Sequence, residues 1–163
     1  MTSSTFLQIK EILDKNNIEY KHLTHEHVHR SEDAAKIRGT NLDEAAKAII
    51  LKVEKKDDSG KYFEYIQVVI AGNERIDLKK LRIMFNSKNV ALASAEEVLE
   101  RTGCTIGSVP PFGILFNIPV YMDRSLSEKS QIVFSAGTHN DSIMMKPDDY
   151  VKIIKPEIID IKK

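Results

Sequence analysis

The sequence predicts an α+β fold in which helices surround a mixed β-sheet. Segments with apolar residues at helical spacing are interleaved with segments that alternate apolar and polar residues, or that are continuously apolar, as strands are. Several strand-like segments follow one another through short turns, and no regular strand–helix–strand repeat is present. The 163 residues can bury one sizeable core, so we expect a single domain over residues 1–163.

Two helices and one strand are expected in the first forty residues. Apolar residues between positions 6 and 13 share one face of a helix, which a pair of asparagines follows. Residues 18–24 alternate like a half-buried strand. Ser31 is a suitable N-cap and Gly39 a suitable left-handed stop, which together predict a second helix.

The middle of the chain has the pattern of a β-hairpin followed by a helix. Residues 45–53 form a buried strand, residues 57–60 provide the turn, and residues 62–71 return as the partner strand. Asp77 is then the expected N-cap of a helix over residues 78–85.

After residue 90 the expected elements are short. Ser94 and Glu97 form a capping box, which starts a helix that ends at Gly103. Residues 125–128 are expected to be a turn, and Pro147 is expected at the first position of the last helix. The expected strands of this part of the chain are residues 90–93, 119–123, 131–135 and 142–146.

The composition limits the classes of function and the cellular location that we expect for this chain. Lysine and arginine together number 24, as do aspartate and glutamate, so no overall charge attracts the chain to nucleic acid or to an anionic membrane. The single cysteine, Cys104, cannot form an internal disulfide, and the N-terminus lacks the features of a signal peptide. No apolar run is long enough to span a membrane. We therefore expect a cytoplasmic protein with neither a membrane nor DNA as a partner.

Residues 103–113 form the most distinctive segment, with three glycines and two adjacent prolines. Such a segment cannot continue a helix or enter a central strand, because proline lacks the N–H and glycine is costly to order. Glycine also allows the backbone to come close to a neighbouring group. The segment is either a binding wall of bare peptide N–H groups or a connector with tight turns, and its own residues leave both interpretations open.

Lys47 lies among small and apolar residues of the strand expected at 45–53. A buried ammonium without a partner is costly, so Lys47 either extends to solvent or faces a polar cavity.

Three histidines, His25, His27 and His29, lie two residues apart. In an extended segment they would share one face, and neutral imidazoles bind zinc, so a metal site is one interpretation. The spacing specifies neither a closed geometry nor the carboxylates that orient such ligands. We therefore favour polar residues on a loop, with one histidine directed into a pocket.

The densest basic cluster comprises Arg75, Lys79, Lys80 and Arg82. Taken alone, such a cluster is more often a solvated helix face than a binding surface.

The sequence offers no clear hydrolytic nucleophile. It contains no phosphate-binding loop, dinucleotide fingerprint or nucleophile elbow. Cys104 has no basic neighbour in sequence, and we expect it to be a small buried residue. A lysine, two glycine loops and a histidine remain, a set that can hold an oxyanion or a phosphate.

Four segments in register resemble the prolyl-tRNA synthetase-associated editing domain, the YbaK/ProX family. They are residues 44–52, 70–81, 103–113 and 134–139. Each motif is weak alone, but their common order from about Ile18 to Ile154 makes the resemblance specific. The resemblance implies hydrolysis of amino acids wrongly attached to tRNA, and the length is similar to that of the family's free-standing members.

The resemblance also implies the site residues. Lys47 matches the family's functional lysine, Gly107 the glycine of its substrate loop, and Gly137 with His139 its second pocket turn. Ser108, Pro110 and Thr138, which are neighbours of these positions in sequence, are then expected to bind substrate, as is His25 of the histidine-rich segment. The basic residues Arg75, Lys79, Lys80 and Arg82 become candidates for contact with the tRNA backbone. In the family the pocket works without metal or another cofactor, and the terminal ribose hydroxyl is thought to assist attack.

The expected function is thus a metal-independent deacylase acting on a small amino acid such as Ala, Cys or Ser on the wrong tRNA. Aminoacyl-tRNA is the expected partner, and a synthetase is left open as a second one. The turn after Gly137 does not single out one amino acid. A non-catalytic adaptor with the same fold, which binds tRNA or a synthetase, remains the alternative.

Overall fold

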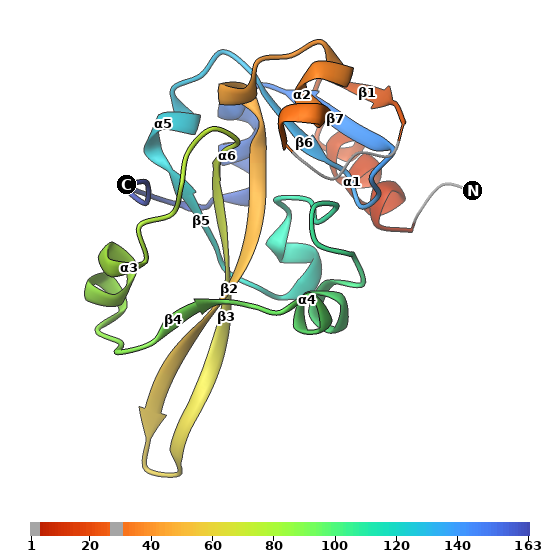
Figure 1. Cartoon of the computed structure of the whole chain (residues 1–163). Coiled ribbons are helices and arrows are strands. Elements are labelled where there is room, and N and C mark those ends of the chain that lie inside the picture. The colour runs from red at the N-terminus through yellow and green to blue at the C-terminus, as the bar shows by residue number, and fades with distance from the viewer. Residues whose placement is uncertain (1–3, 27–30) are drawn as a thin grey trace.

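The strands form two sheets in the part of the chain that the structure, a computed structural model, describes: residues 4–26 and 31–163 (Figure 1). The smaller sheet is antiparallel with the order β1-β7-β6 and the larger sheet is mixed with the order β4-β2-β3-β5-β8. The smaller sheet contains β1 (Tyr20–Thr24), β6 (Ile132–Ser135) and β7 (Asp141–Met145). The larger contains β2 (Ala46–Asp57), β3 (Gly60–Ala71), β4 (Val90–Leu92), β5 (Val120–Asp123) and β8 (Glu157–Ile159).

The α+β class is confirmed, but the single sheet that the sequence predicts is divided in two. The division occurs beside β2, whose preceding residue Ala45 makes an isolated parallel bridge to Val133 of β6. The smaller sheet therefore continues from one end of β2, and the larger sheet is built around the rest of that strand.

The β2–β3 hairpin is the longest feature of the larger sheet. Its register runs without interruption from the pair Ala46 and Ala71 to the pair Asp57 and Gly60. The far half of the hairpin projects as an arm from the body of the molecule (Figure 1). The near half is flanked by helices, and the apolar run at its base is buried.

The helices begin and end close to the predicted positions. They are α1 (Ser4–Lys15), α2 (Ser31–Arg38), α3 (Leu78–Phe85), α4 (Ala95–Thr102), α5 (Arg124–Ser127) and α6 (Pro147–Ile154), with 3₁₀ turns η1 (Leu42–Glu44) and η2 (Gly113–Phe116). The Asp77 carboxylate accepts hydrogen bonds from two backbone N–H groups of α3. Ser94 and Glu97 form the predicted capping box, and Gly103 ends α4 with φ of 72°. No helix among the described residues is long and apolar enough to cross a bilayer.

The short elements near the C-terminal end were the hardest to predict. A turn was expected at residues 125–128, and residues 124–127 form the short helix α5, whereas β8 was not expected. β8 is three residues long and has no full alternation of its own, and its position depends on parallel pairing with β5.

Three apolar clusters form the core and include part of the 103–113 loop. One cluster packs α1 and α6 against the smaller sheet, and a second packs α3 on one face of the larger sheet. The third lies on the opposite face, where Ile50 of β2, Val98 of α4 and Val109 of the loop are buried together. Figure 1 shows α3 and α4 on opposite sides of the β2–β3 pair. The loop is therefore held against the sheet rather than extended over the surface.

Candidate active site

A pocket of about 320 Å³ lies beside β2, and it contains two of the residues expected from the sequence. Lys47 of β2 and Gly107 of the 103–113 loop both line it. The other lining residues are apolar and come from β2, β4 with its following residue, α4 and the loop: Ala48, Ile49, Ile50, Leu92, Ala93, Val98, Ile106 and Val109. The volume falls at the lower end of the range typical of small-molecule sites.

Lys47 is the charged residue among the described residues that line this pocket. Its side chain is half-buried, and its amine donates a hydrogen bond to the Gly72 carbonyl oxygen at 3.4 Å. Burial, and then the positive charge of Arg75, lower the pKa of Lys47, while Glu74 acts in the opposite direction. Among the described residues no carboxylate lies within ion-pair distance of this amine. A half-buried cation without a carboxylate partner is a suitable position for an anion or a developing negative charge.

The second half of the 103–113 loop is fixed by buried side chains. Gln67 of β3 is fully buried, and its amide donates to the Pro110 carbonyl at 2.9 Å while its oxygen accepts from the Gly113 N–H at 3.0 Å. The Tyr150 hydroxyl donates to the Pro111 carbonyl at 2.6 Å. The Pro110 carbonyl is already bound by Gln67, so we assign Pro110 a role in fixing the shape of the loop.

The two glycine loops are joined to one another. Gly107 and Gly137 have φ values of 91° and 97°, which favour glycine. The Gly137 N–H donates to the Ser108 carbonyl at 2.9 Å, and Thr105 Oγ1 lies 2.9 Å from His139 Nε2. The Gly137 N–H is therefore occupied in holding the loops together, whereas Gly107 lines the pocket.

His25 lies beside the second loop rather than in the pocket. Its Nε2 is 2.7 Å from the Ser142 hydroxyl, and its backbone N–H donates to the Asn140 carbonyl. His27 and His29 lie outside the described residues. Within the described ranges no group of three potential metal ligands is found.

The neighbouring Thr138 shapes the same turn. Its hydroxyl donates to the Asp141 carboxylate at 2.6 Å and accepts from the Asn140 and Asp141 backbone N–H groups. Burial disfavours the charged Asp141, but hydrogen bonds from Thr138 and His22 outweigh this and lower its pKa. Thr138 and Asp141 therefore hold the turn that carries His139.

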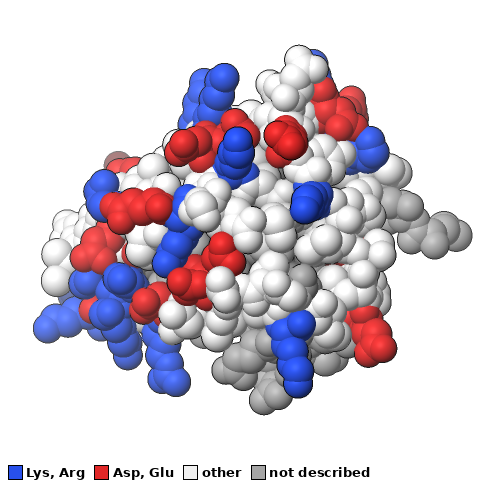
Figure 2. Space-filling model, turned by 90° about the horizontal axis from the view of Figure 1, so that it is seen from above, with Lys and Arg blue, Asp and Glu red and all other residues white. Residues whose placement is uncertain are grey.

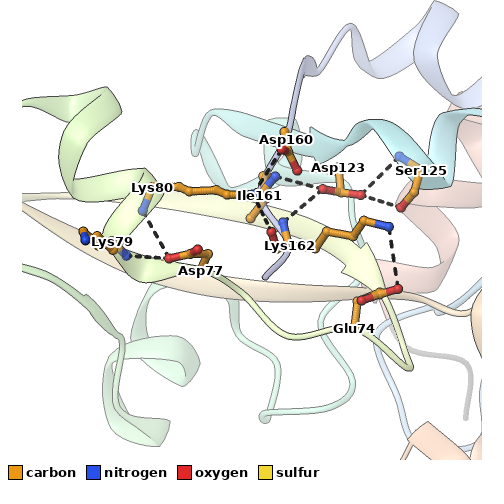
Figure 3. A network of polar contacts seen from close by, with 9 residues as sticks. All are labelled: Glu74, Asp77, Lys79, Lys80, Asp123, Ser125, Asp160, Ile161 and Lys162. Carbon is orange, nitrogen blue, oxygen red and sulfur yellow. Dashed lines mark hydrogen bonds and ion pairs between the residues drawn. The ribbon is translucent and has the colours of Figure 1, made fainter.

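The basic cluster is divided between exposed and ion-paired members. Arg75 and Lys79 are exposed. The Lys80 amine donates to Asp160 at 3.0 Å and to the Lys162 carbonyl at 2.8 Å, within a network around the C-terminal residues (Figure 3). Figure 2 shows basic side chains gathered on the side where α3 and the C-terminus lie in Figure 1, with acidic side chains among them. Arg75 also lies near enough to Lys47 to affect its pKa.

Cys104 is a small buried residue, as expected. Only 3% of its surface is exposed, and burial raises the pKa of its thiol above the usual value. The protonated thiol is a poor nucleophile.

Sequence reasoning missed most of the apolar walls of the pocket, and it missed Gln67. The walls come from four separate elements whose meeting point depends on the fold. Gln67 carried a usable signal, because it is a polar residue within the apolar run of β3, and a buried amide needs partners.

Comparison with known proteins shows the family to which the chain belongs. The family described as the aminoacyl-tRNA editing domain matches residues 25–153. The chain is 30% identical to the multifunctional Ser/Thr-tRNA deacylase ProXp-y of Escherichia coli K12, over 99% of this chain and 95% of that protein. It is 27% identical to the prolyl-tRNA editing protein ProX of Acetoanaerobium sticklandii, over 88% and 86% of the two chains.

The fold is also shared with a solved structure. A candidate trans-editing enzyme for prolyl tRNA synthetase superimposes with a TM-score of 0.77 at 22% identity, covering 100% of this chain and 99% of the other. By the extent of the family match and the near full-length similarity to the E. coli protein, this chain belongs to the aminoacyl-tRNA editing domain family.

Proposed function

We propose that the chain hydrolyses the ester that joins a small amino acid to the terminal ribose of a wrongly charged tRNA. Water bonds to the ester carbonyl carbon, the bond from that carbon to the ribose oxygen breaks, and the proton released by the water ends on that ribose oxygen. A synthetase distinguishes amino acids that differ by one methylene by only about 1–3 kcal/mol, so such errors need a second site. The products are the free amino acid and the uncharged tRNA.

The observation that carries this proposal is that Lys47, which has a half-buried side chain, and Gly107 line the same pocket. Negative charge develops on the ester carbonyl oxygen during attack, and a pre-positioned cation or N–H group lowers the free energy of that state. Lys47 is the group that binds either this oxygen or the terminal phosphate. Gly107 lines the same pocket and has no side chain that would cover its backbone. Its φ of 91° is one that favours glycine.

The surrounding residues support attack by water, with assistance from the ribose hydroxyl, rather than by a protein nucleophile. The Ser108 hydroxyl is buried and donates to the Thr105 carbonyl at 2.8 Å. The Cys104 thiol is buried with a raised pKa. Neither side chain lines the pocket.

The test is hydrolysis of a panel of aminoacyl-tRNAs by the whole chain and by Lys47→Ala. We expect the parent protein to release alanine, cysteine, serine or threonine from a mismatched tRNA, and Lys47→Ala to reduce kcat at least about 100-fold, as removal of a transition-state donor does. Lys56→Ala is the matched control, because Lys56 is an exposed lysine in the projecting arm of the same strand. Activity of Lys47→Ala within a few-fold of the parent would remove Lys47 from the mechanism.

The same panel separates the alternatives. Binding of tRNA without hydrolysis by the parent protein would support the adaptor, and hydrolysis abolished by a chelator would support a histidine metal site. Hydrolysis that a chelator does not change supports the metal-independent deacylase.

The exposed basic residues are proposed to contact the acceptor-stem backbone. Arg75 is the first candidate, because it is exposed and near Lys47. Replacing Arg75 or Lys79 with alanine should weaken tRNA binding and reduce the slope of log K against log salt by about 1 each. Replacing Lys80 should reduce the slope less, because its amine is already bound to Asp160 and to the Lys162 carbonyl.

A further inference from the structure

The pocket lies along an open edge of β2. Successive residues of a strand point to opposite faces, so a pocket on one face contacts every second residue. Here four consecutive residues, from Lys47 to Ile50, line the same pocket. Such a pocket runs along the edge of the strand, where the peptide groups themselves are presented.

The register shows which peptide groups these are. In an antiparallel strand both backbone groups of a residue point to one side, and successive residues alternate. The Ala45 carbonyl accepts from Gly72 N–H on the β3 side, and the Ile50 carbonyl accepts from Ala93 N–H on the β4 side. Because β2 pairs with β3 without a bulge, the backbone N–H and C=O groups of the even-numbered residues of β2 point away from β3. Ala48 therefore directs both its N–H and its C=O toward the pocket edge.

No neighbouring strand reaches Ala48 among the residues that the structure describes. β4 pairs with β2 only from Leu51 to Val53, and the bridge to the smaller sheet is made by Ala45. Between these points the Ala48 N–H and C=O have no hydrogen-bond partner in the described chain. The surrounding walls are apolar, so these groups remain costly unless water or a ligand satisfies them.

We propose that this edge binds the aminoacyl group as a single-residue antiparallel β-bridge, an inference that rests on the proposed deacylase function. An aminoacyl ester carries one ammonium and one carbonyl on the same α-carbon, the pair of groups that one strand residue exchanges with its partner. The substrate ammonium donates to the Ala48 carbonyl oxygen, and the Ala48 N–H donates to the ester carbonyl oxygen. The Ala48 N–H therefore faces the oxygen on which negative charge develops.

This arrangement gives the pocket a recognition rule. The backbone of the amino acid is held by Ala48, whatever its side chain. The amino-acid side chain meets the walls that include Ile50, Val98 and Val109, none of which offers a hydrogen bond. The free α-amino group is then a requirement for binding, and a small apolar side chain such as that of alanine leaves no buried polar group unpaired.

The protein-side test is Ala48→Pro, which removes the outward N–H and closes a ring on that nitrogen. Proline is tolerated at strand positions whose N–H is not part of the ladder, and no β2–β3 hydrogen bond is lost. Lys56→Pro is the matched control, because the backbone N–H of Lys56 also points away from β3. Lys56 lies in the exposed arm, beyond the residues that pair with β4. We expect Ala48→Pro to reduce kcat about 100-fold and Lys56→Pro to leave kcat within about two-fold. A folded Ala48→Pro protein with kcat within two-fold of the parent would overturn the bridge.

The substrate-side test needs no variant. The probe is 3′-deoxyadenosine carrying alanine through a 3′-amide, which is not cleaved like the ester, and its counterpart without the α-amino group. In ¹⁵N-alanine-labelled protein we expect the first compound to move the Ala48 amide proton resonance downfield and slow its exchange, and the second to bind at least about 10-fold more weakly, as the loss of a charged hydrogen bond predicts. Equal binding of the two compounds, or an unchanged Ala48 resonance on binding, would refute the proposal. Binding with these features in a protein that hydrolyses no aminoacyl-tRNA would instead refute the deacylase function and retain the bridge.

Discussion

The two halves of the 103–113 loop are built in opposite ways. Residues from Ser108 to Gly113 are buried, and Gln67 and Tyr150 bind the carbonyls of its two prolines. Thr105, Ile106 and Gly107 are exposed. The core therefore holds residues 108–113 in place, whereas residues 105–107 are presented at the surface. The comparison shows how a loop can provide a fixed wall for a pocket while its backbone remains accessible to a ligand.

The two halves of the loop should differ most in the loss of stability caused by substituting their glycines, Gly113 and Gly107. A Cβ on Gly113 would lie 2.7 Å from Val120 Cγ2 and closer still to the Ile118 carbonyl oxygen, and backbone there cannot move cheaply. We expect Gly113→Ala to lower the free energy of unfolding by at least about 3 kcal/mol. Gly107→Ala should cost about 1–2 kcal/mol, because its φ of 91° disfavours a side chain. Urea denaturation measures both, and equal costs would contradict the division of the loop.

The next largest loss of stability is expected on replacing the buried amide of Gln67. Gln67→Met keeps the length of the side chain but leaves the Pro110 carbonyl and the Gly113 N–H unpaired in the core. Each of these two unpaired groups costs about 1–3 kcal/mol, so we expect a loss of about 2–6 kcal/mol in stability. A loss below 1 kcal/mol would show that the loop is held by packing alone.

Loss of a single hydrogen bond should have a smaller effect. Tyr150→Phe removes the donor to the Pro111 carbonyl and should cost about 1–2 kcal/mol. Tyr121→Phe is the control, because the Tyr121 hydroxyl has no hydrogen-bond partner among the described residues. Thermal unfolding of both variants tests this difference. Similar melting temperatures for the two would contradict the role assigned to Tyr150.

The sequence predicted those parts of the fold whose signals are local. Asp77, Ser94 and Gly103 fix helix ends through their own side chain or backbone, and each was confirmed. The division into two sheets was not predictable, because it depends on where β4 stops pairing and where Ala45 meets Val133. These are contacts between residues far apart in the chain.

As with the fold, only those parts of the candidate site that have a local signal in the sequence were predicted. The charged and glycine positions stand out in the sequence, and Lys47 and Gly107 do line one pocket. The edge at Ala48, which no other described residue pairs with, could not be predicted, because alanine carries no chemical signal and its backbone becomes available only where a neighbouring strand ends.

Lys47 borders the exposed half of the loop, and its titration provides the most subtle test of this environment. Burial lowers the pKa of Lys47 in the folded protein, so between that value and the usual 10.5 the unfolded chain binds more protons than the folded one. Stability must therefore rise with pH in this window, and the rise must be absent in Lys47→Met. The effect should be the smallest of the four, because half of the side chain remains in contact with solvent.

The measurement is urea denaturation from pH 7 to 10.5, with Lys56→Met as the baseline for loss of a lysine on the same strand. The difference between the parent and Lys47→Met isolates this one group, because the other titrating groups are common to both proteins. If the two stability curves stay parallel throughout this range, Lys47 is solvated in the folded protein, and the pocket that it borders is too open to strengthen its interaction with an anionic substrate. A rise confined to the parent would instead establish a partly desolvated cation, which is the condition under which one amine can substantially stabilise the transition state.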